Sequence, residues 1–261
     1  FVAGVVVVAI LLGKSPMTLF AGLGATSAVL MLVFKDTILG LAAGVRLTSN
    51  DMLHKGDWIT VKSVDANGIV EDMSLTTVKV RNFDNTIVTI SPATLVNGSF
   101  QNWIGMQKSG GRRVKRIVYF DFRSIRLVDE TLKQTLLDKH FATEDSFKLK
   151  ESLQKAIEKD IQEGKDIEDL KNPAALAPTN LQLYRRFMEK YLRQRPEVNT
   201  ELTLMVRHME ATQCGLPIEF YFFIKDKVWV NYEHILADIM EHAYALANEF
   251  GLKIYEQYPE Q

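Results

Sequence analysis

Two runs of apolar residues open the chain, and almost all of its charged residues follow them. The longer run lies in Met17–Leu47, and its first part, Thr18–Phe34, is roughly 17 residues without a charge, about the shortest length that crosses a bilayer as a helix. The shorter run, Phe1–Leu12, precedes it across Gly13–Pro16, whose composition is typical of a tight turn. Two tandem apolar runs joined by such a turn predict a helical hairpin in a membrane.

The longer run is rich in small side chains before it reaches a charged pair. The small residues are Ala21, Gly22, Gly24, Ala25, Thr26, Ser27 and Ala28. Small residues let helix backbones approach closely in lipid. Lys35 and Asp36 then interrupt the run, and Gly40 and Gly44 lie in its amphipathic continuation, Thr37–Leu47. This order predicts a pore-lining helix that packs against copies of itself and bends. The alternatives are a core helix of a soluble protein and a plain membrane anchor.

Charge divides the chain into a membrane part and a larger polar part. Charged residues make up 24% of the 261 residues, yet the first 34 carry only Lys14. The residues after Leu47 are enough for one or two soluble domains. A net charge of −1 gives no reason to expect nucleic acid as a partner. The single cysteine, Cys214, excludes an intrachain disulfide framework and fits a reducing compartment.

The first apolar run and the flanking charges predict how the chain sits in the membrane. Phe1–Leu12 is too short to span a bilayer, so we expect the sequence to begin partway through a membrane helix. No basic segment precedes this run and no cleavage site follows it, which argues against a secretory signal. Basic residues lie mainly after the second run: Lys35, Arg46, His54 and Lys55, against Lys14 before it. The positive-inside rule therefore places the carboxyl-terminal side in the cytoplasm.

A β-rich region is predicted directly after the helix. Gly56–Val61 opens it, and the Asn-Gly pair within Asp65–Gly68 is a strong hairpin signal. The further predicted strands are Gly68–Glu71, Leu75–Phe83, Thr86–Ser91 and Ser99–Trp103, with a turn at Asn82–Thr86 and a turn or short helical connection at Pro92–Gly98. Short strands at this spacing predict a small barrel-like sheet, because roughly 50 residues hold too few strands for a β-sandwich.

The remainder of the chain predicts a mixed α/β domain. Lys108–Arg116 combines a Gly-Gly pair with a basic cluster and is interpreted as an interdomain hinge, since no aromatic residues alternate with its charges as in a single-strand binding surface. Strands are predicted at Arg116–Phe122, with Val118, Phe120 and Phe122 on one face, and at Leu202–Met209 and Pro217–Ile224. Helices are predicted at Ser124–His140, with Ile125, Val128, Leu132 and Leu136 in one stripe, and at Val230–Phe250, with Leu236, Ile239, Met240, Ala243, Ala247 and Phe250 in one stripe.

The charged segment Thr143–Asn199 is interpreted as an insertion in this domain. Two amphipathic stripes are predicted in it: Phe147, Leu149, Leu153, Ile157 and Ile161, then Leu181, Tyr184, Phe187, Met188 and Tyr191. A loop is predicted between them at Gly164–Pro178. A partner surface and a simple structural wall are both open as its role.

No group of residues argues for catalysis or for a cofactor. His234, Asp238 and His242 share one face of the last predicted helix, but such a face is normally only solvated, and we predict no metal site. Nothing beside Cys214 would activate it as a nucleophile. The sequence has no phosphate loop, dinucleotide-binding glycine motif or hydrolase elbow. We therefore predict a protein that is not an enzyme.

A family resemblance rests on an ordered series of short segments after the small-residue helix. They are Leu41–Val45, Gly56–Ile59, Gly68–Glu71, Leu75–Thr77 and Asp84–Thr86, the last leading into a predicted strand. The order and spacing of these segments resemble the small-conductance mechanosensitive channel (MscS) family over roughly Met17–Trp103. The larger terminal domain resembles the miniconductance (YbdG-like) branch of that family.

The resemblance implies an architecture of three parts. Residues 1–47 would be transmembrane segments, including a kinked pore-lining helix at 17–47, and residues 48–107 a Sm-like β-domain. Residues 108–261 would form a cytoplasmic α/β vestibule domain with a helical insertion at about 143–199. Seven copies would surround one pore as a homoheptamer in a bacterial inner membrane.

The resemblance also assigns roles to positions in the membrane helix. When the family pattern is aligned on Leu41–Gly44, its two apolar constriction positions fall on Ala28 and Leu32. A spacing of four residues places both on one helix face with Ala21 and Ala25. An apolar ring stops ions because water leaves a narrow apolar constriction. Leu32 is therefore the main candidate for the gate, and Ala28 would form a wider ring.

Three features depart from the family pattern. The second half of the span, Leu30–Phe34, is bulky where relatives have alanine and glycine that let the helices slide. The glycine at which the family's helix often kinks corresponds to Asp36, so the hinge is predicted at Lys35, Asp36, Gly40 and Gly44 together. The Pro-Asn pair after the last β-domain strand is replaced by the sequence at Ser91–Ala93.

Two functions from different classes follow. The first is a mechanosensitive channel that membrane tension opens, releasing ions and small solutes during hypo-osmotic shock, with membrane lipid as its other partner. The second is a membrane-anchored, ring-forming scaffold whose cytoplasmic domains bind a partner. A continuous lumen distinguishes the channel from the scaffold.

Overall fold

The computed structural model describes residues 2–13, 15–148, 155, 159 and 177–257. The chain forms two compact units, Phe1–Gly105 and Met106–Gln261, and each is described by itself. The first contains an apolar helical part and a five-stranded sheet, and the second contains a three-stranded sheet with its helices. The predicted division at residues 47/48 and 107/108 stays a prediction.

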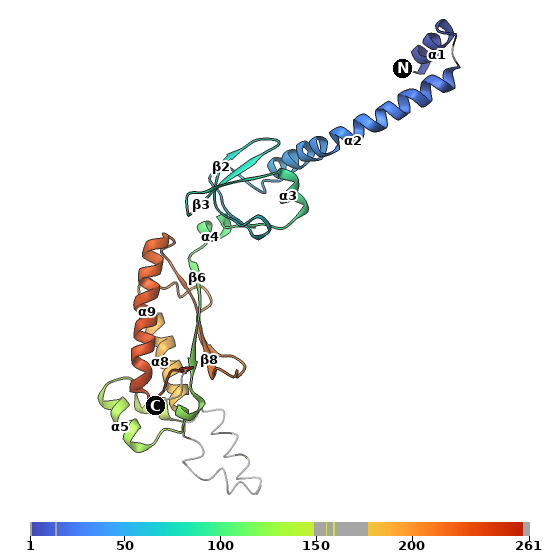
Figure 1. The fold of residues 1–261 in the computed structure, drawn as a ribbon. Coiled ribbons are helices and arrows are strands. Elements are labelled where there is room, and N and C mark those ends of the chain that lie inside the picture. Colours follow the sequence, from blue (N-terminus) through green and yellow to red (C-terminus); the bar gives the residue numbers. More distant parts are fainter. Residues whose placement is uncertain (1, 14, 149–154, 156–158, 160–176, 258–261) are drawn as a thin grey trace. The chain divides into compact units, whose positions relative to one another are not determined.

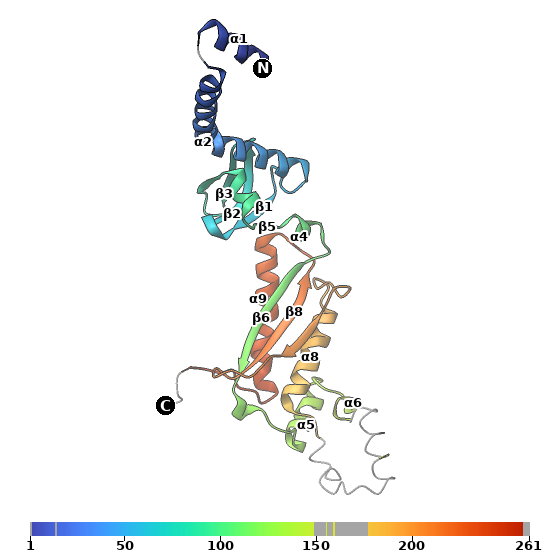
Figure 2. The same cartoon turned by 90° about the vertical axis from the view of Figure 1, so that its right-hand side faces the viewer.

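The first unit begins with two helices, α1 (Val2–Leu11) and α2 (Pro16–Ser49). Ser15 starts α2, since its side chain accepts a hydrogen bond from the Thr18 amide and Pro16 takes the first helical position. At a rise of 1.5 Å per residue, the 34 residues of α2 extend roughly 50 Å. Within the described residues, α2 is the one helix long and apolar enough to cross a membrane. Figure 2 shows that it changes direction partway along.

A five-stranded antiparallel sheet with the order β4-β3-β2-β1-β5 follows α2. Its strands are β1 (Trp58–Val61), β2 (Ala66–Met73), β3 (Val78–Asn82), β4 (Ile87–Ile90) and β5 (Gln101–Asn102). The helix α3 (Pro92–Asn97) joins β4 to β5 and lies against α2. Inward-facing side chains alternate along the strands and form the core with Leu47, Leu53 and Leu95.

The predicted Asn-Gly hairpin turn is wrong. Asn67 and Gly68 lie inside β2 and pair with Thr60 and Ile59 of β1. The chain reverses earlier, through a 3-10 turn that ends at Asp65 in the left-handed conformation (φ 51°). Gly68 is needed for packing, because a Cβ there would lie 1.9 Å from the Arg81 carbonyl oxygen of β3.

The second unit is built on a three-stranded antiparallel sheet with the order β6-β8-β7. The strands are β6 (Arg112–Phe120), β7 (Met205–His208) and β8 (Leu216–Ile224). The helices are α4 (Ile104–Lys108), which crosses the boundary of the units, α5 (Glu130–Asp138), α6 (Glu144–Phe147), α8 (Asn180–Gln194) and α9 (Trp229–Glu249). Figure 1 shows α8 and α9 on one side of this sheet, and they enclose the core with it.

The two long helices of this unit match their predicted stripes. The buried residues of α9 and its C-cap include all six predicted ones: Leu236, Ile239, Met240, Ala243, Ala247 and Phe250. In α8, Leu181, Tyr184 and Met188 are buried, and Phe187 and Tyr191 pack against the same core. Most of the other predicted stripe, from Leu149 to Ile161, lies outside the described residues.

The predicted helix at Ser124–His140 is shorter than expected. It begins at Glu130, because the Asp129 side chain accepts a hydrogen bond from the Leu132 amide and caps the helix. The residues before it form a 3-10 turn at Phe122–Ser124 and an extended segment. Phe122 is therefore 47% exposed and does not share the buried face of Val118 and Phe120.

Asn180, at the start of α8, fastens this extended segment to the core. It is fully buried, and its side-chain amide donates to the carbonyls of Ser124 and Phe250 at 2.9 and 3.0 Å. Its side-chain oxygen accepts from the Arg126 amide at 3.0 Å. One side chain thus satisfies backbone groups from two segments far apart in sequence.

Candidate functional site

The apolar part of α2 has one small face and one bulky face. At 100° per residue, Ala21, Ala25, Ala28 and Leu32 fall within an arc of about 60° on a regular helix. The opposite face carries larger side chains: Leu19, Leu23, Leu30, Phe34 and Leu41. A small face admits another helix backbone at short distance, and a bulky face suits lipid. The structure thus keeps the four predicted pore residues on one continuous helix.

The most apolar part of this span is not covered by the described residues of the chain. None of its most apolar 18 residues is buried, and the side chain of Leu32 is 74% exposed. Val29, Met31 and Val33, on other sides of the helix, are also exposed by more than half. A soluble monomer rarely exposes so large an apolar surface. The span therefore requires lipid, further protein or both around it.

Lys35 and Asp36 follow Leu32 on the surface of α2. On a regular helix they fall on either side of the line through Ala28 and Leu32, and both are exposed. The helix continues through them without a break in its assigned span. The change of direction seen in Figure 2 shows that α2 is bent, and the assignment of the hinge to these residues stays a prediction.

The end of α2 is anchored in the five-stranded unit, a role that the sequence analysis missed. Ala43, Gly44 and Leu47 are buried. A Cβ at Gly44 would lie 2.2 Å from the Leu75 carbonyl oxygen, whereas one at Gly40 would meet nothing within 4 Å. The two predicted hinge glycines therefore differ, because Gly44 permits close contact with the loop before β3. The small residues in the segment 41–44 were the available signal for this contact.

A buried carboxylate fixes the path of the chain between α2 and β1. Asp57 is 7% exposed and accepts hydrogen bonds from the His54 amide at 3.1 Å and the Asn102 side chain at 2.8 Å. The Asn102 amide also donates to the Met52 carbonyl. These bonds tie the segment after α2 to β5. Asp57 therefore has a structural role. It belongs to the segment Gly56–Ile59, on which part of the family resemblance rests.

The aromatic residue of the same segment holds β1 in place. Trp58 stacks on Trp103 with ring centroids 4.7 Å apart, and its indole nitrogen donates to the Asn67 side-chain oxygen at 2.9 Å. The Trp103 indole donates in turn to the Thr60 hydroxyl at 2.9 Å. These contacts join β1 to β2 and to the residue that follows β5.

The candidate metal residues of α9 have local structural contacts. His242 lies 2.9 Å from the Asp238 carbonyl oxygen through its Nδ1 and stacks on Tyr191. Across the described ranges of the chain, His, Cys, Asp and Glu form no group of three that could hold a metal ion. Cys214 is exposed in the turn before β8.

Comparison with known proteins agrees with this geometry. Residues 36–105 match the family model described as the mechanosensitive ion channel β-domain. The chain is 33% identical over 90 residues to the small-conductance mechanosensitive channel MscMJ of Methanocaldococcus jannaschii, covering 34% of this chain and 25% of that protein. It is 29% identical over 139 residues to the large-conductance channel MscMJLR of the same organism, covering 53% of this chain and 38% of that protein.

Solved structures extend the similarity in fold beyond the β-domain. The Arabidopsis thaliana MSL1 structure matches with a TM-score of 0.64 at 11% identity, covering 98% of this chain and 72% of that one. The closed-state Helicobacter pylori MscS structure matches with a TM-score of 0.57 at 13% identity, covering 96% and 74%.

A long apolar helix that runs into a β-domain of the mechanosensitive ion channel type gives the class that this chain resembles. The chain is similar to MscS-family channels in sequence over its β-domain and to MscS-like structures in fold. It spans only 25% and 38% of the length of the two Methanocaldococcus channels that it matches.

Proposed function

We propose that the protein is a mechanosensitive ion channel whose pore is lined by α2 from several copies of the chain. The observation that carries the proposal is the unburied span of α2, with one face of small residues and Leu32 and an opposite bulky face. A ring of such helices would turn the small faces toward each other and the bulky faces toward lipid. The family relationship supports a ring of about seven copies.

The closed gate in this proposal is a ring of Leu32 side chains. Side chains of this kind around a narrow lumen exclude water, and ions do not enter a dry constriction. Ala28, one turn before, would form a wider ring, and Ala25 and Ala21 would line the pore beyond it. The barrier to ions therefore depends mainly on the ring of Leu32 side chains.

Membrane tension would act on α2, which consists of an apolar span and an end anchored in the β-domain. Stretching the bilayer favours whichever state has the larger in-plane area. The end of α2 is held by Gly44 and Leu47 in the β-domain, while the apolar span before it has no such contacts. Tilting of the span about the Lys35–Gly40 region would widen the ring and leave the anchorage intact. No nucleotide, metal or cofactor takes part in this motion.

The rest of the assembly follows the family architecture. The five-stranded sheet would act as the Sm-like domain, and the second unit as the wall of a cytoplasmic vestibule. We place the protein in a bacterial inner membrane as a multi-pass subunit, where it would release ions and small solutes under hypo-osmotic shock. The larger second unit is the reason for proposing the miniconductance (YbdG-like) branch.

Patch-clamp recording of the full-length protein in excised membrane tests the channel directly. Leu32→Ser should open at lower suction than the wild type, because a hydroxyl ring keeps the constriction wet. Leu30→Ser is the matched control, since Leu30 lies on the opposite, bulky face of the same helix turn. We expect its opening threshold to stay closer to that of the wild type.

The same recording separates the channel from a membrane-anchored scaffold. A scaffold predicts no current under suction in the wild type or in either variant. Equal shifts for Leu32→Ser and Leu30→Ser would contradict the gate assignment, because substitution on the lipid face would then act as strongly as substitution in the pore.

A further inference from the structure

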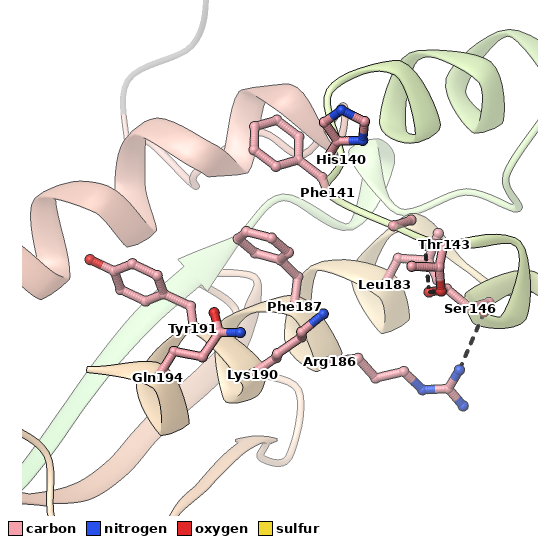
Figure 3. Close-up of a pocket in the computed structure, with 11 residues that line it drawn as sticks. His140, Phe141, Thr143, Ser146, Leu183, Arg186, Phe187, Lys190, Tyr191 and Gln194 are labelled. Atoms are coloured by element: carbon pink, nitrogen blue, oxygen red, sulfur yellow. Dashed lines mark hydrogen bonds between the residues drawn. The ribbon is translucent and has the colours of Figure 1, made fainter. Parts of the chain in front are cut away.

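The second unit contains a cavity of about 250 Å³ between α8 and the turn that follows α5. Its walls come from the face of α8 that carries Leu183, Phe187, Tyr191 and Gln194, and from the segment 140–146 (Figure 3). This volume lies just below the range of pockets that hold drug-sized ligands. The cavity therefore suits a small metabolite rather than a peptide.

One part of the cavity wall is aromatic. The rings of Phe141 and Phe187 meet edge to face with centroids 5.3 Å apart, and both rings also pack on Phe250. Tyr191 extends this apolar wall along α8 and is held by stacking on His242. A wall of fixed rings offers a flat apolar group a preformed surface.

The other part of the wall is cationic. Arg186 and Lys190 line the cavity from α8, and no Asp or Glu is among its described lining residues. Arg186 makes one long hydrogen bond, 3.5 Å, to the Ser146 carbonyl, and Lys190 makes no ion pair or hydrogen bond within the described part of the chain. Figure 3 shows Lys190 on the same side of α8 as Phe187. Among the described lining residues, the cavity thus has cationic donors and no carboxylate beside them.

The backbone at His140 gives an independent indication. His140 has φ 58° and follows the C-cap of α5, with its amide bonded to the Leu137 carbonyl and the Phe141 amide bonded to the Leu136 carbonyl. This Schellman arrangement favours glycine at the left-handed position, and the corresponding position after α9 is Gly251 with φ 65°. Here an imidazole stands at the rim of the cavity where glycine would have less backbone strain.

We propose that this cavity binds a small organic anion, a phosphate or carboxylate group attached to a flat apolar body. The anionic group lies against Lys190, whose N–H groups donate to its oxygens, and the side chains of Arg186 and His140 line the cavity on different sides of it (Figure 3). The apolar body packs on Phe187, Phe141 and Tyr191. The site lies wholly within the second unit, so the proposal is independent of the pore.

Fluorine NMR of 4-fluorophenyl phosphate with the detergent-solubilised full-length protein tests the site. We expect saturable binding, and Lys190→Gln should raise the Kd roughly tenfold, the loss typical of one charge-assisted hydrogen bond. Arg193→Gln is the matched control, because Arg193 lies three residues further along α8, is exposed and does not line the cavity. It should leave the Kd within about twofold of the wild type.

His140→Gly separates binding from folding. Glycine relieves the left-handed backbone, so the Tm should not fall, while the Kd for 4-fluorophenyl phosphate should rise several-fold. Inorganic phosphate should compete at least tenfold more weakly than the aryl phosphate, because it lacks the apolar body.

Three results would overturn the proposal. They are an absence of saturable binding by the folded wild type, equal effects of Lys190→Gln and Arg193→Gln, and competition by inorganic phosphate as strong as that by unlabelled phenyl phosphate. The last would mean that the cations attract any anion and that the aromatic wall plays no part.

Discussion

Gly40 and Gly44 lie one turn apart in α2 but have different surroundings. A Cβ at Gly44 would fall 2.2 Å from the Leu75 carbonyl oxygen, far inside van der Waals contact, while the space around Gly40 is open. The backbone of Leu75 cannot move as a side chain can, so the contact depends on the absence of a side chain at Gly44. Gly44 therefore lets α2 pack against the loop before β3, and this role differs from that of a flexible hinge.

Gly44→Ala should lower the free energy of unfolding of the first unit by about 1–3 kcal/mol, the usual cost of forcing a methyl group into a packed contact. Gly40→Ala should raise it by up to about 1 kcal/mol, because alanine is the better helix former. Thermal unfolding of the purified variants measures both changes. A Gly44→Ala protein as stable as Gly40→Ala would show that α2 does not dock as described.

Helix α8 is held to α9 by a buried phenol. The Tyr184 hydroxyl donates to the Ala243 carbonyl at 2.6 Å, and the ring lies edge to face with Phe120 and Phe250. Burial raises the pKa of Tyr184 above its usual value of about 10. Burial also raises the pKa of Tyr232, which donates to the Arg113 carbonyl at 2.9 Å. The folded second unit therefore favours both phenols in their protonated form.

Alkaline pH should destabilise the second unit, and Tyr184→Phe should reduce this loss of stability. A phenol whose pKa is raised by folding stabilises the fold below pH 10, and this contribution is lost as the pH rises above 10. Tyr184→Phe should cost about 1 kcal/mol at pH 7 and should show a smaller fall in Tm between pH 9 and 11 than the wild type. Tyr119→Phe, at an exposed position, should match the wild type, and an unchanged pH profile in Tyr184→Phe would refute the argument.

The elements that the sequence predicted best are those whose core defines a clear period. The stripe of α9 and most of that of α8 follow from apolar residues spaced at three and four, because one sheet face buries them all. The ends of elements were harder to predict, since they depend on local caps. Asp129 starts α5 five residues after the predicted position, and nothing in the apolar pattern distinguishes it from Ser124.

The wrong turn at Asn67 and Gly68 has a physical cause of the same kind. An Asn-Gly pair is favourable in a two-residue hairpin, but glycine also serves where two backbones approach closely. Gly68 serves the second purpose against Arg81 of β3. The Asn67 side chain accepts from the Trp58 indole instead of shaping a turn. Such uses depend on tertiary neighbours and cannot be inferred from the dipeptide.

At the scale of the whole molecule, a single copy of the chain leaves the apolar span of α2 uncovered by its described residues. Its apolar span is unburied, and a closed ring is the arrangement that would give every copy the same neighbours. The proposed pore residues could be placed on one helix face from their spacing, but in the proposed ring the second helix in each contact would belong to another copy. No property of one chain determines how many copies complete the ring.

Native mass spectrometry of the detergent-extracted full-length protein should therefore report one dominant assembly of about seven copies. The number follows from the family relationship, and the closed ring from the two faces of α2. A monomer or dimer that remains the dominant species in mild detergent would contradict the ring, because the small face would then have no partner helices.

Thiol modification of Leu32→Cys during single-channel recording tests the central claim most directly, in a Cys214→Ser background that removes the chain's own cysteine. The account predicts that a charged, water-soluble methanethiosulfonate reagent irreversibly changes the open-channel current of Leu32→Cys. The matched variant Leu30→Cys, on the bulky face, should be unaffected. An unchanged current in Leu32→Cys, or an equal change in both variants, would contradict a pore lined by this face of α2.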